Sequence, residues 1–404
     1  MADPRTTPVI VSSARTAIGR FLGGLSSLKA PELGAVVIRE AVARAGIEPG
    51  QVQDVIMGHV LQGGVGQAPA RQAAIKAGIP PEVPAMAVNK VCGSGLKSVA
   101  LAAQSIRAGD DELIVAGGME SMSSAPYYLF GYRDGVKFGT REMIDGMVYD
   151  GLWCGFYNRH MGGHAEYTGM KTGISRADQD EYAYNSQMKA VAAIEGGKFK
   201  QEIVPVEIPG RKGEVTVVDT DEGPRKETTL ERLAKLKPAF ADSAPSDVKE
   251  CTVTPGNAST LNDGAAALVV TSERFAKGNG LDIVARIKNY AVGSTEPQEL
   301  FFAPIVAVRK LMEKDGTSIG DYDLIEINEA FAVQTLADGR ELGWDWDRVN
   351  VHGGGIALGH PIGASGARIL VTLLHAMEDR DVKLGLATLC LGGGSAVALS
   401  VERV

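Results

Sequence analysis

The 404-residue chain has few cysteines and no recognisable cysteine pattern. Cys92, Cys154, Cys251 and Cys390 lie far apart and form no CxxC pair. This spacing argues against a disulfide framework and against a zinc site, so we expect no bound metal. Free thiols fit a reducing cytoplasm, and each cysteine has to be judged by its neighbours.

Long apolar runs and clusters of positive charge are also missing. No stretch reaches the roughly 20 apolar residues that a membrane span needs, and the N-terminal "MADPRTTPVIVSSART" lacks the pattern of an export signal. The net charge is -8, and no lysine or arginine cluster lies along one helix face. We expect a soluble, cytoplasmic protein that binds neither nucleic acid nor membranes.

Three common catalytic motifs are absent from the sequence. The chain has no P-loop, no GxSxG nucleophile elbow and no GxGxxG fingerprint. Nucleotide hydrolysis, serine esterase chemistry and dinucleotide binding therefore lose their usual support.

Glycine is abundant, with 50 residues, and many glycines fall where an apolar strand-like run meets a helical pattern. Residues 54–60 and 111–118 have the pattern of buried strands, and residues 96–109 that of an alanine-rich helix ending at a glycine cap. This alternation predicts an α/β fold.

The same succession occurs twice. Four segments of the first half recur in the same order in the second half, which favours a duplicated domain over the generic texture of α/β proteins. The paired segments are 30–42 with 303–314, 54–60 with 323–330, 93–106 with 364–377, and 113–118 with 384–389.

A different kind of sequence, aromatic and charged, separates the copies. We predict an N-terminal half of residues 1–123 plus 258–280, an inserted loop domain of residues 124–257, and a C-terminal half of residues 281–404. Inserted segments often carry ligand contacts, although this one could instead only complete an oligomer.

The first candidate for chemistry is Cys92, in "VCGSGL". It stands at the start of the predicted helix, where the helix dipole and unpaired N–H groups would lower the pKa of the thiol. Gly93 and Gly95 would permit a tight turn and leave room for a substrate. Taken alone, such a cysteine is more often a buried apolar residue.

His360 lies at the equivalent point of the second repeat, in the glycine-rich "NVHGGGIALGHPIGASGAR". If the two copies pack about a pseudo-twofold axis, His360 meets Cys92 and can hold it as a thiolate–imidazolium pair. A loop histidine without that repeat would have an even chance of being structural.

Two further candidates lie at strand ends of the second copy. Cys390 precedes three glycines and could carry a proton, while the neighbouring N–H groups could bind an oxyanion. Asn328, in "EINEAFA", could position a water molecule or act only as a helix cap. We interpret the other residues of these types as structural: His59, His164, His352, His375, Cys154 and Cys251.

Six motifs in order resemble the thiolase family, in particular its acetyl-CoA acetyltransferase type. They are "NKVCGSGLKS", "GGMESMSSAPY", "VTPGNASTLNDGAAA", "NEAFA", "GGGIALGHPIGASGAR" and "CLGGG". The resemblance runs through nearly the whole chain. It implies a five-layer αβαβα fold of two similar halves with an inserted loop domain, assembled as a dimer or tetramer.

The resemblance also implies catalytic roles. Cys92 would be acylated by one acyl-CoA, His360 would activate it, and Cys390 would remove the Cα proton of a second acyl-CoA. One oxyanion site would consist of His360 and a water on Asn328, and the other of the backbone N–H groups of Cys92 and Gly392. Each donor in such a site is worth on the order of 3 kcal/mol.

Coenzyme A thioesters are the implied substrates and products, with no tightly bound cofactor. The matching positions place His160 and Met161 beside the pantetheine, Ser259 near its amide, and Arg225 and Phe240 around the nucleotide. Phe331, in "NEAFA", is also expected at the CoA site.

The chain departs from the family pattern in two places. Residues 300–307 read "LFFAPIVA" where relatives have "MGTGPIPA", which puts the short-chain preference in doubt, and His352 replaces an asparagine. Two interpretations of His352 stay open: it forms a hydrogen bond to residues that surround the site, or the exchange is neutral.

The implied activity is the reversible condensation of two acetyl-CoA molecules to acetoacetyl-CoA and CoA, or thiolysis of a 3-ketoacyl-CoA. The alternatives are a longer-chain 3-ketoacyl-CoA thiolase, a decarboxylating ketoacyl synthase, which should lack Cys390, and a non-catalytic acyl-CoA-binding scaffold. The intact set of candidate residues argues against the scaffold.

Overall fold

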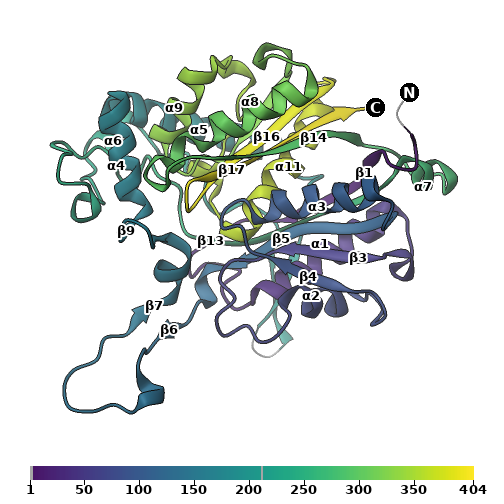
Figure 1. Cartoon of the computed structure of the whole chain (residues 1–404), viewed down its shortest axis with the longest axis horizontal. Coiled ribbons are helices and arrows are strands. Elements are labelled where there is room, and N and C mark those ends of the chain that lie inside the picture. Colours follow the sequence, from purple (N-terminus) through teal and green to yellow (C-terminus); the bar gives the residue numbers. More distant parts are fainter. Residues whose placement is uncertain (1–2, 211–212) are drawn as a thin grey trace.

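The computed structural model describes residues 3–210 and 213–404. One continuous 11-stranded sheet folds into two sheet layers, which alternate with three layers of helices (Figure 1). We call these layers the first and the second sheet. Because helices cover both faces of the inner strands, β1, β5, β13 and β16 are buried along nearly their whole length, as the apolar runs predict, whereas β4 and β14 are partly exposed.

The first sheet has the spatial order β1-β13-β5-β3-β4. Strands β3, β4 and β5 run parallel, whereas β13 is antiparallel to both β5 and β1. The strands are β1 (Pro8–Thr16), β3 (Asp54–Gly58), β4 (Ala85–Val88), β5 (Leu113–Ser121) and β13 (Asn262–Ser272), with the short β2 (Gly19–Arg20) paired to β13.

The second sheet has the order β14-β17-β16-β15 and joins the first through a short pairing of β14 with β1. Strands β15 and β16 are parallel, and β17 is antiparallel to both of its neighbours. The strands are β14 (Ala285–Ser294), β15 (Leu324–Ile327), β16 (Leu384–Leu391) and β17 (Ser395–Arg403).

Helices α3 (Ser94–Ala108) and α11 (Ile362–Asp379) form the middle layer between the sheets. Their N-terminal turns approach closely, because a Cβ atom on Gly95 would lie 2.7 Å from the Ala367 nitrogen. The outer layers contain α1 (Ala30–Ala45) and α2 (Pro69–Ala77) on the first sheet, and α8 (Ala303–Asp315) on the second, followed by α9 (Ala332–Leu342).

The predicted duplication is confirmed by this arrangement. The segments paired in the sequence form α1 and α8, β3 and β15, α3 and α11, and β5 and β16, and each pair occupies corresponding places in the two halves. Equivalent loops of the two copies therefore meet at the N-terminal ends of α3 and α11.

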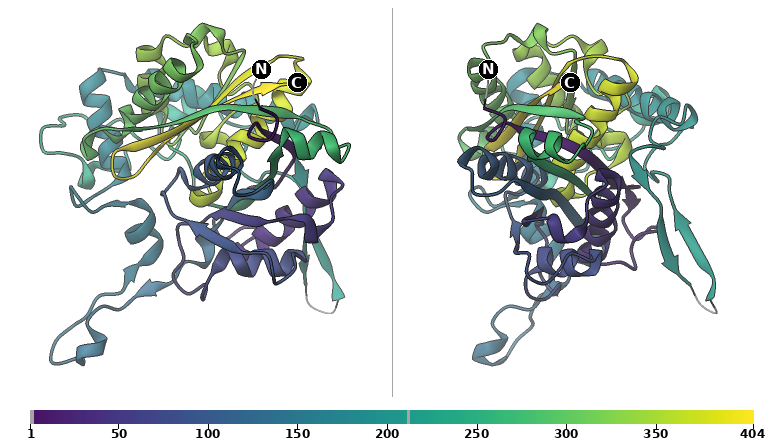
Figure 2. Two further views of the ribbon diagram at one scale, coloured as in Figure 1. Left: turned by 45° about the vertical axis from the view of Figure 1, so that its right-hand side comes forward. Right: turned by 90° about the vertical axis from the view of Figure 1, so that its right-hand side faces the viewer.

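The segment between the copies carries several short elements and a projecting arm. The arm is the hairpin of β6 (Tyr127–Tyr128) and β7 (Ile144–Asp145), which extends away from the sheets (Figures 1 and 2). The other elements of this segment are β8 (Trp153–Cys154), β9 (Arg159–His160), α4 (Met161–Thr172), α5 (Arg176–Glu195), β10 (Ile203–Val204), β11 (Val206–Pro209), β12 (Val215–Val218) and α6 (Leu230–Ala234).

Two further short helices complete the fold: α7 (Glu273–Gly278) and α10 (Gly355–Leu358). No helix in the described ranges is long and apolar enough to cross a bilayer.

Candidate active site

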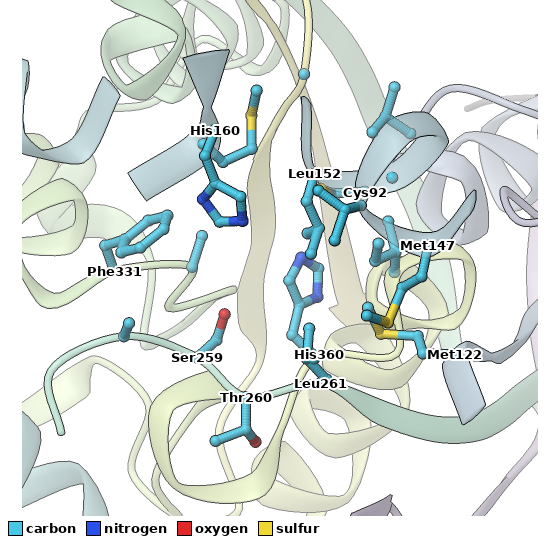
Figure 3. Close-up of a pocket in the computed structure, with 18 of the residues that line it drawn as sticks. Cys92, Met122, Met147, Leu152, His160, Ser259, Thr260, Leu261, Phe331 and His360 are labelled. Carbon is cyan, nitrogen blue, oxygen red and sulfur yellow. The ribbon is translucent and has the colours of Figure 1, made fainter. Parts of the chain in front are cut away.

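A single cavity of about 490 Å³ opens where the two halves and the inserted segment meet. It contains every residue predicted for catalysis or CoA binding except Asn328. In Figure 3, Cys92 and His360 lie toward one end, with Met122 and Met147, while His160 and Phe331 lie across the cavity. The predicted residues on its wall are Cys92, His160, Met161, Arg225, Phe240, Ser259, Phe331, His360, Cys390 and Gly392.

A strained turn presents Cys92 to this cavity. Val91 has a φ of 46°, in the left-handed region that a β-branched residue rarely adopts, at a cost of about 1–3 kcal/mol. Ser94 holds the turn, since its Oγ accepts from the Lys90 N–H at 2.8 Å and donates to the Val91 carbonyl at 2.6 Å. The sulfur is thereby fixed just before α3, whose N-cap is Gly93.

The glycines after Cys92 serve packing more than substrate access, which corrects the sequence interpretation. A Cβ atom on Gly93 would lie 2.5 Å from Cδ2 of Leu391, and one on Gly95 would meet the backbone of α11. Both glycines therefore allow the two halves to approach, and the room for substrate lies on the other side of Cys92.

The expected lowering of the Cys92 pKa is wrong. Burial raises the pKa of the thiol to about 12, and the backbone N–H groups of Cys92 and Gly392 offset only part of that shift. The two N–H groups come from different halves of the molecule, since Gly392 directly follows β16. Desolvation raises the pKa of Cys92 more than the N-terminal end of α3 lowers it. The thiol is therefore protonated, and a base has to remove its proton before or during attack.

His360 is placed to be that base. Its backbone N–H donates to Oδ1 of Asn262 at 2.9 Å, and its Nδ1 lies 2.5 Å from Oγ of Ser365. The Ser365 hydroxyl also lies 2.8 Å from the Pro361 carbonyl, which can only accept. Since a hydroxyl has one hydrogen, both contacts are satisfied when Nδ1–H donates to Ser365, which leaves the Nε2 lone pair available.

Burial also determines the charge state of His360. Desolvation, assisted by the positive charge of Arg368, lowers the pKa of His360 to about 3. At neutral pH the pair is accordingly a thiol beside a neutral imidazole, rather than the thiolate–imidazolium pair expected from the sequence. Proton transfer has to accompany attack on a substrate, because neither ion is stable alone in this cavity.

Asn328 lies behind His360 and not on the cavity wall. Its Nδ2 is 3.4 Å from both ring nitrogens of His360, and its side chain is fully buried. Within residues 3–210 and 213–404 its Oδ1 has no hydrogen-bond partner. A buried acceptor of this kind suits a bound water molecule.

Cys390 is the second-last residue of strand β16 and is only 1% exposed. Burial raises the pKa of its thiol well above the usual value, and the nearby Cys92 sulfur adds to the shift. The two sulfur atoms thus interact, and a thiolate at Cys390 would be an unusually strong base.

Aromatic rings form the wall opposite Cys92. The His160 imidazole stacks on Phe240 with centroids 4.9 Å apart, and Phe331 meets the edge of Phe240 at 6.0 Å. Gly162 is required for this stack, because its Cβ would lie 2.1 Å from the Phe240 ring. Ser259 is held beside Phe331 by a backbone hydrogen bond to Ala330.

Sequence analysis missed several residues of the cavity. Phe301 packs edge-on to Phe331, with ring centroids 5.3 Å apart. Phe301 and Leu300 both line the cavity, and both belong to the segment "LFFAPIVA", which differs from the family pattern. Ser365 was not assigned a role, although its position five residues after His360, in the first turn of the following helix, is a signal that could have been used.

The remaining histidines and cysteines lie outside the cavity. His59 is buried 3.3 Å from Glu120, His352 packs edge-on to Phe199, and His375 lies near Ser13. His164 is also buried, with Nδ1 near the Gln298 carbonyl. These contacts agree with structural roles.

Comparison with known proteins agrees with this geometry. Family descriptions "Thiolase, N-terminal domain" and "Thiolase, C-terminal domain" match residues 8–274 and 281–403. The chain belongs to the thiolase family. This confirms the resemblance and, with the layered structure, the predicted fold class.

Curated relatives match over almost their whole length. An acetyl-CoA acetyltransferase of Pseudomonas aeruginosa is 56% identical over 98% of this chain and 99% of the relative. One from Cupriavidus necator is 55% identical over 98% and 100%. The crystal structure of the Bacillus anthracis acetyl-CoA acetyltransferase is similar with a TM-score of 0.95 and 43% identity, covering 98% of this chain and 99% of that one.

Proposed function

We propose that this thiolase condenses two molecules of acetyl-CoA to acetoacetyl-CoA and CoA, and catalyses the reverse thiolysis. The observation that carries the proposal is one cavity that contains Cys92, His360 and Cys390, with two backbone N–H groups at the Cys92 sulfur. The names of the relatives support acetyl-CoA as the substrate.

In the first half-reaction, Nε2 of His360 takes the proton of Cys92 as the sulfur attacks the thioester carbonyl. The N–H groups of Cys92 and Gly392 stabilise the oxyanion. CoA leaves as a thiolate and takes the proton of Cys390. The enzyme then holds an acetyl group on Cys92, an imidazolium at His360 and a thiolate at Cys390.

In the second half-reaction, the Cys390 thiolate removes a Cα proton from a second acetyl-CoA. The enolate oxygen accepts hydrogen bonds from the His360 imidazolium and from a water held by Asn328. The enolate carbon attacks the acetyl group on Cys92. Cys92 leaves as a thiolate and recovers a proton from His360, so every group returns to its starting state.

The raised pKa of Cys390 supports this division of labour. A thiol with a high pKa gives a thiolate of high basicity, which the weakly acidic Cα–H requires. A decarboxylating ketoacyl synthase forms its carbanion by loss of carbon dioxide and has no use for such a base.

For CoA binding, we assign the pantetheine to the wall made by His160, Met161 and Phe331, with Ser259 at its amide. Phe240 and Arg225 lie toward the nucleotide. The packed rings of His160, Phe240 and Phe331 give this wall an apolar surface on which an unbranched arm can lie.

A longer-chain 3-ketoacyl-CoA thiolase is the main alternative. Against it, Phe301 is 2% exposed and packs in one apolar cluster with Phe331 and Cys390, so its ring occupies space that a long acyl chain could otherwise use. Phe301 therefore favours short acyl groups. The difference of residues 300–307 from the family pattern does not by itself indicate a longer chain.

The test is a thiolysis assay with CoA and 3-ketoacyl-CoA substrates of increasing chain length, coupled to product identification. We expect kcat/KM to be largest for acetoacetyl-CoA. Higher kcat/KM for the longer chains would favour the alternative, and no thiolysis of any of them would contradict the proposal.

We also propose that residues 124–257 act as a loop domain for CoA binding and assembly, and that the chain forms a dimer or tetramer. The arm exposes Tyr127, Phe130, Tyr132 and Phe138, an apolar surface that a second copy would cover. Two functional thiols require a reducing compartment, which supports a cytoplasmic location. Light scattering of the purified protein tests the assembly.

A further inference from the structure

The carboxyl group of Glu329 is buried next in sequence to Asn328, and the proposed mechanism gives it no role. Glu329 is 1% exposed and does not line the cavity. Four groups donate hydrogen bonds to it, which fills the four acceptor positions of a carboxylate. Oε1 accepts from Oη of Tyr182 at 2.9 Å and Nδ2 of Asn350 at 2.8 Å, and Oε2 from Oγ of Ser186 at 2.7 Å and the backbone N–H of Ile356 at 3.1 Å.

The four donors come from separate parts of the chain. Tyr182 and Ser186 belong to α5 of the inserted segment, Asn350 lies between α9 and α10, and Ile356 lies on α10. Helix α10 leads directly to the loop of the catalytic histidine. Glu329 thereby joins the loop after β15 to the loop around α10, and it fixes both of them against α5.

The carboxyl group is enclosed tightly. A Cβ atom on Gly354 would lie 2.3 Å from Cδ of Glu329, so a glycine is needed for the α10 loop to approach so closely. Asn350 adds a second tie, because its Oδ1 accepts from the Ile327 N–H at 2.9 Å and its Nδ2 donates to the Ile327 carbonyl at 2.9 Å. The end of β15 and the carboxyl group are thus held as one unit.

Asn328 depends on this unit more than His360 does. His360 has anchors of its own in Asn262 and Ser365. Among the residues that the structure describes, the Asn328 side chain is in hydrogen-bonding range of the His360 ring alone, so its placement follows from its backbone. The second half-reaction uses the water held by Asn328, whereas acylation of Cys92 uses a different oxyanion site.

We propose that Glu329 is a positioning residue for the second half-reaction: its carboxylate aims the Asn328 amide, with the water that it holds, at the enolate oxygen beside His360. The inference rests on the proposed function and adds a residue to it. The N–H of Asn328 donates to the Thr388 carbonyl at 3.1 Å on one side, and Glu329 holds the residue on the other. Misplacement of a catalytic group by about 1 Å can cost about 10²-fold in rate.

The experiment compares two rates in the full-length wild type and in Glu329→Gln. Acetylation of Cys92 is followed by rapid quench and intact-mass measurement, and deuterium exchange at the methyl group of acetyl-CoA is followed by NMR. Glutamine keeps the shape of the side chain but replaces one acceptor by an NH₂ group that faces two donors. We expect exchange to fall by about 10- to 100-fold and acetylation by less than about 3-fold.

Two milder variants keep the test decisive if Glu329→Gln fails to fold. Tyr182→Phe and Ser186→Ala each remove one donor and keep the carboxylate, so exchange should fall by about 2- to 10-fold while acetylation stays near its wild-type rate. The matched control is Glu166→Gln on α4, whose carboxyl group is also 1% exposed and accepts from the N–H groups of Thr252 and Val253 at 2.8 and 3.0 Å. It should lower stability to urea and leave the ratio of the two rates unchanged.

The ratio of exchange to acetylation separates positioning from a purely structural role. A wild-type ratio in Glu329→Gln or, if that protein does not fold, in both milder variants would overturn the inference and leave the proposed function intact. A lowered ratio in Glu166→Gln would also overturn it, since loss of stability alone would then explain the effect. Failure of the wild type to acetylate Cys92 would overturn the proposed function as well.

Discussion

The two halves of this molecule carry different chemistry at equivalent positions. In the aligned repeats His59 of the first half corresponds to Asn328 of the second, and Met119 corresponds to Cys390. His59 lies beside Glu120, both fully buried and away from the cavity. Cys390 instead lines the cavity, and Asn328 contacts the His360 ring from behind.

At the corresponding strand end of the first half, Glu120 has a structural role. Its carboxylate accepts from the backbone N–H groups of Val60, Leu61 and Gly363 at 3.2, 3.1 and 2.8 Å, respectively. Gly363 belongs to α11 of the other half, so this carboxylate ties the halves together. Duplication supplied two sets of strand ends, of which one became structural and the other catalytic.

The largest effect should come from the nucleophile. Cys92→Ala removes the atom that carries the acyl group, so we expect kcat for condensation to fall by about 10⁴-fold or more. Cys251→Ala, a thiol outside the cavity, is the matched control and should retain activity. If a steady-state assay found substantial turnover in Cys92→Ala, Cys92 would not be the nucleophile.

The base should be next. Cys390→Ala keeps Cys92 and His360 but removes the proton donor to the leaving CoA, so we expect acylation to continue at a reduced rate. Proton exchange at the methyl group of acetyl-CoA should fall by about 10²- to 10⁴-fold, because the base is gone. NMR detection of deuterium incorporation from heavy water measures the exchange. Exchange at the wild-type rate would mean that another group is the base.

Asn328→Ala tests whether Asn328 holds a catalytic water molecule. It thereby tests whether Asn328 differs in role from His59, its structural counterpart in the first half. We expect a loss of kcat of about 10²-fold, because one oxyanion donor is lost while the nucleophile remains. Circular dichroism should show an unchanged fold. A loss of stability with normal activity per folded molecule would make Asn328 structural, like His59.

Glu120→Gln tests the structural half of the comparison. The neutral amide accepts more weakly from the three N–H groups, so we expect the free energy of unfolding to fall by about 3 kcal/mol. Urea denaturation measures the change, and Glu313→Gln, on the exposed face of α8, is the control. Unchanged stability would show that Glu120 does not hold the halves together.

The smallest effect should be that of pH on acylation. The His360 imidazole is neutral, and can act as a base, at every pH above its lowered pKa of about 3. The Cys92 thiol stays protonated at every pH below its raised pKa of about 12. Between these limits the neutral pair persists, so kcat/KM for acylation should be flat from about pH 5 to 9. A titration limb between pH 6 and 8, measured by stopped flow, would instead indicate a thiolate–imidazolium pair.

The sequence patterns predicted the α/β class and the duplication, and the family resemblance implied the layers and ten of the residues that line the cavity. Apolar runs and glycine caps determine the strands and helices locally, and the repeat predicted that Cys92 and His360 would meet. The pKa of Cys92 was predicted in the wrong direction, because desolvation depends on side chains brought from both halves. The roles of Gly95 and Phe301 were missed for the same reason, since each depends on a partner distant in the sequence.

The measurement that tests the account most directly is peptide mapping by mass spectrometry after brief exposure of the wild type and Cys390→Ala to acetyl-CoA. The account predicts an acetyl group on the peptide that contains Cys92 in both proteins, and none on the peptide that contains Cys390. Acetyl transfer to Cys390, or to neither cysteine, would contradict the assignment of the nucleophile to one half and the base to the other.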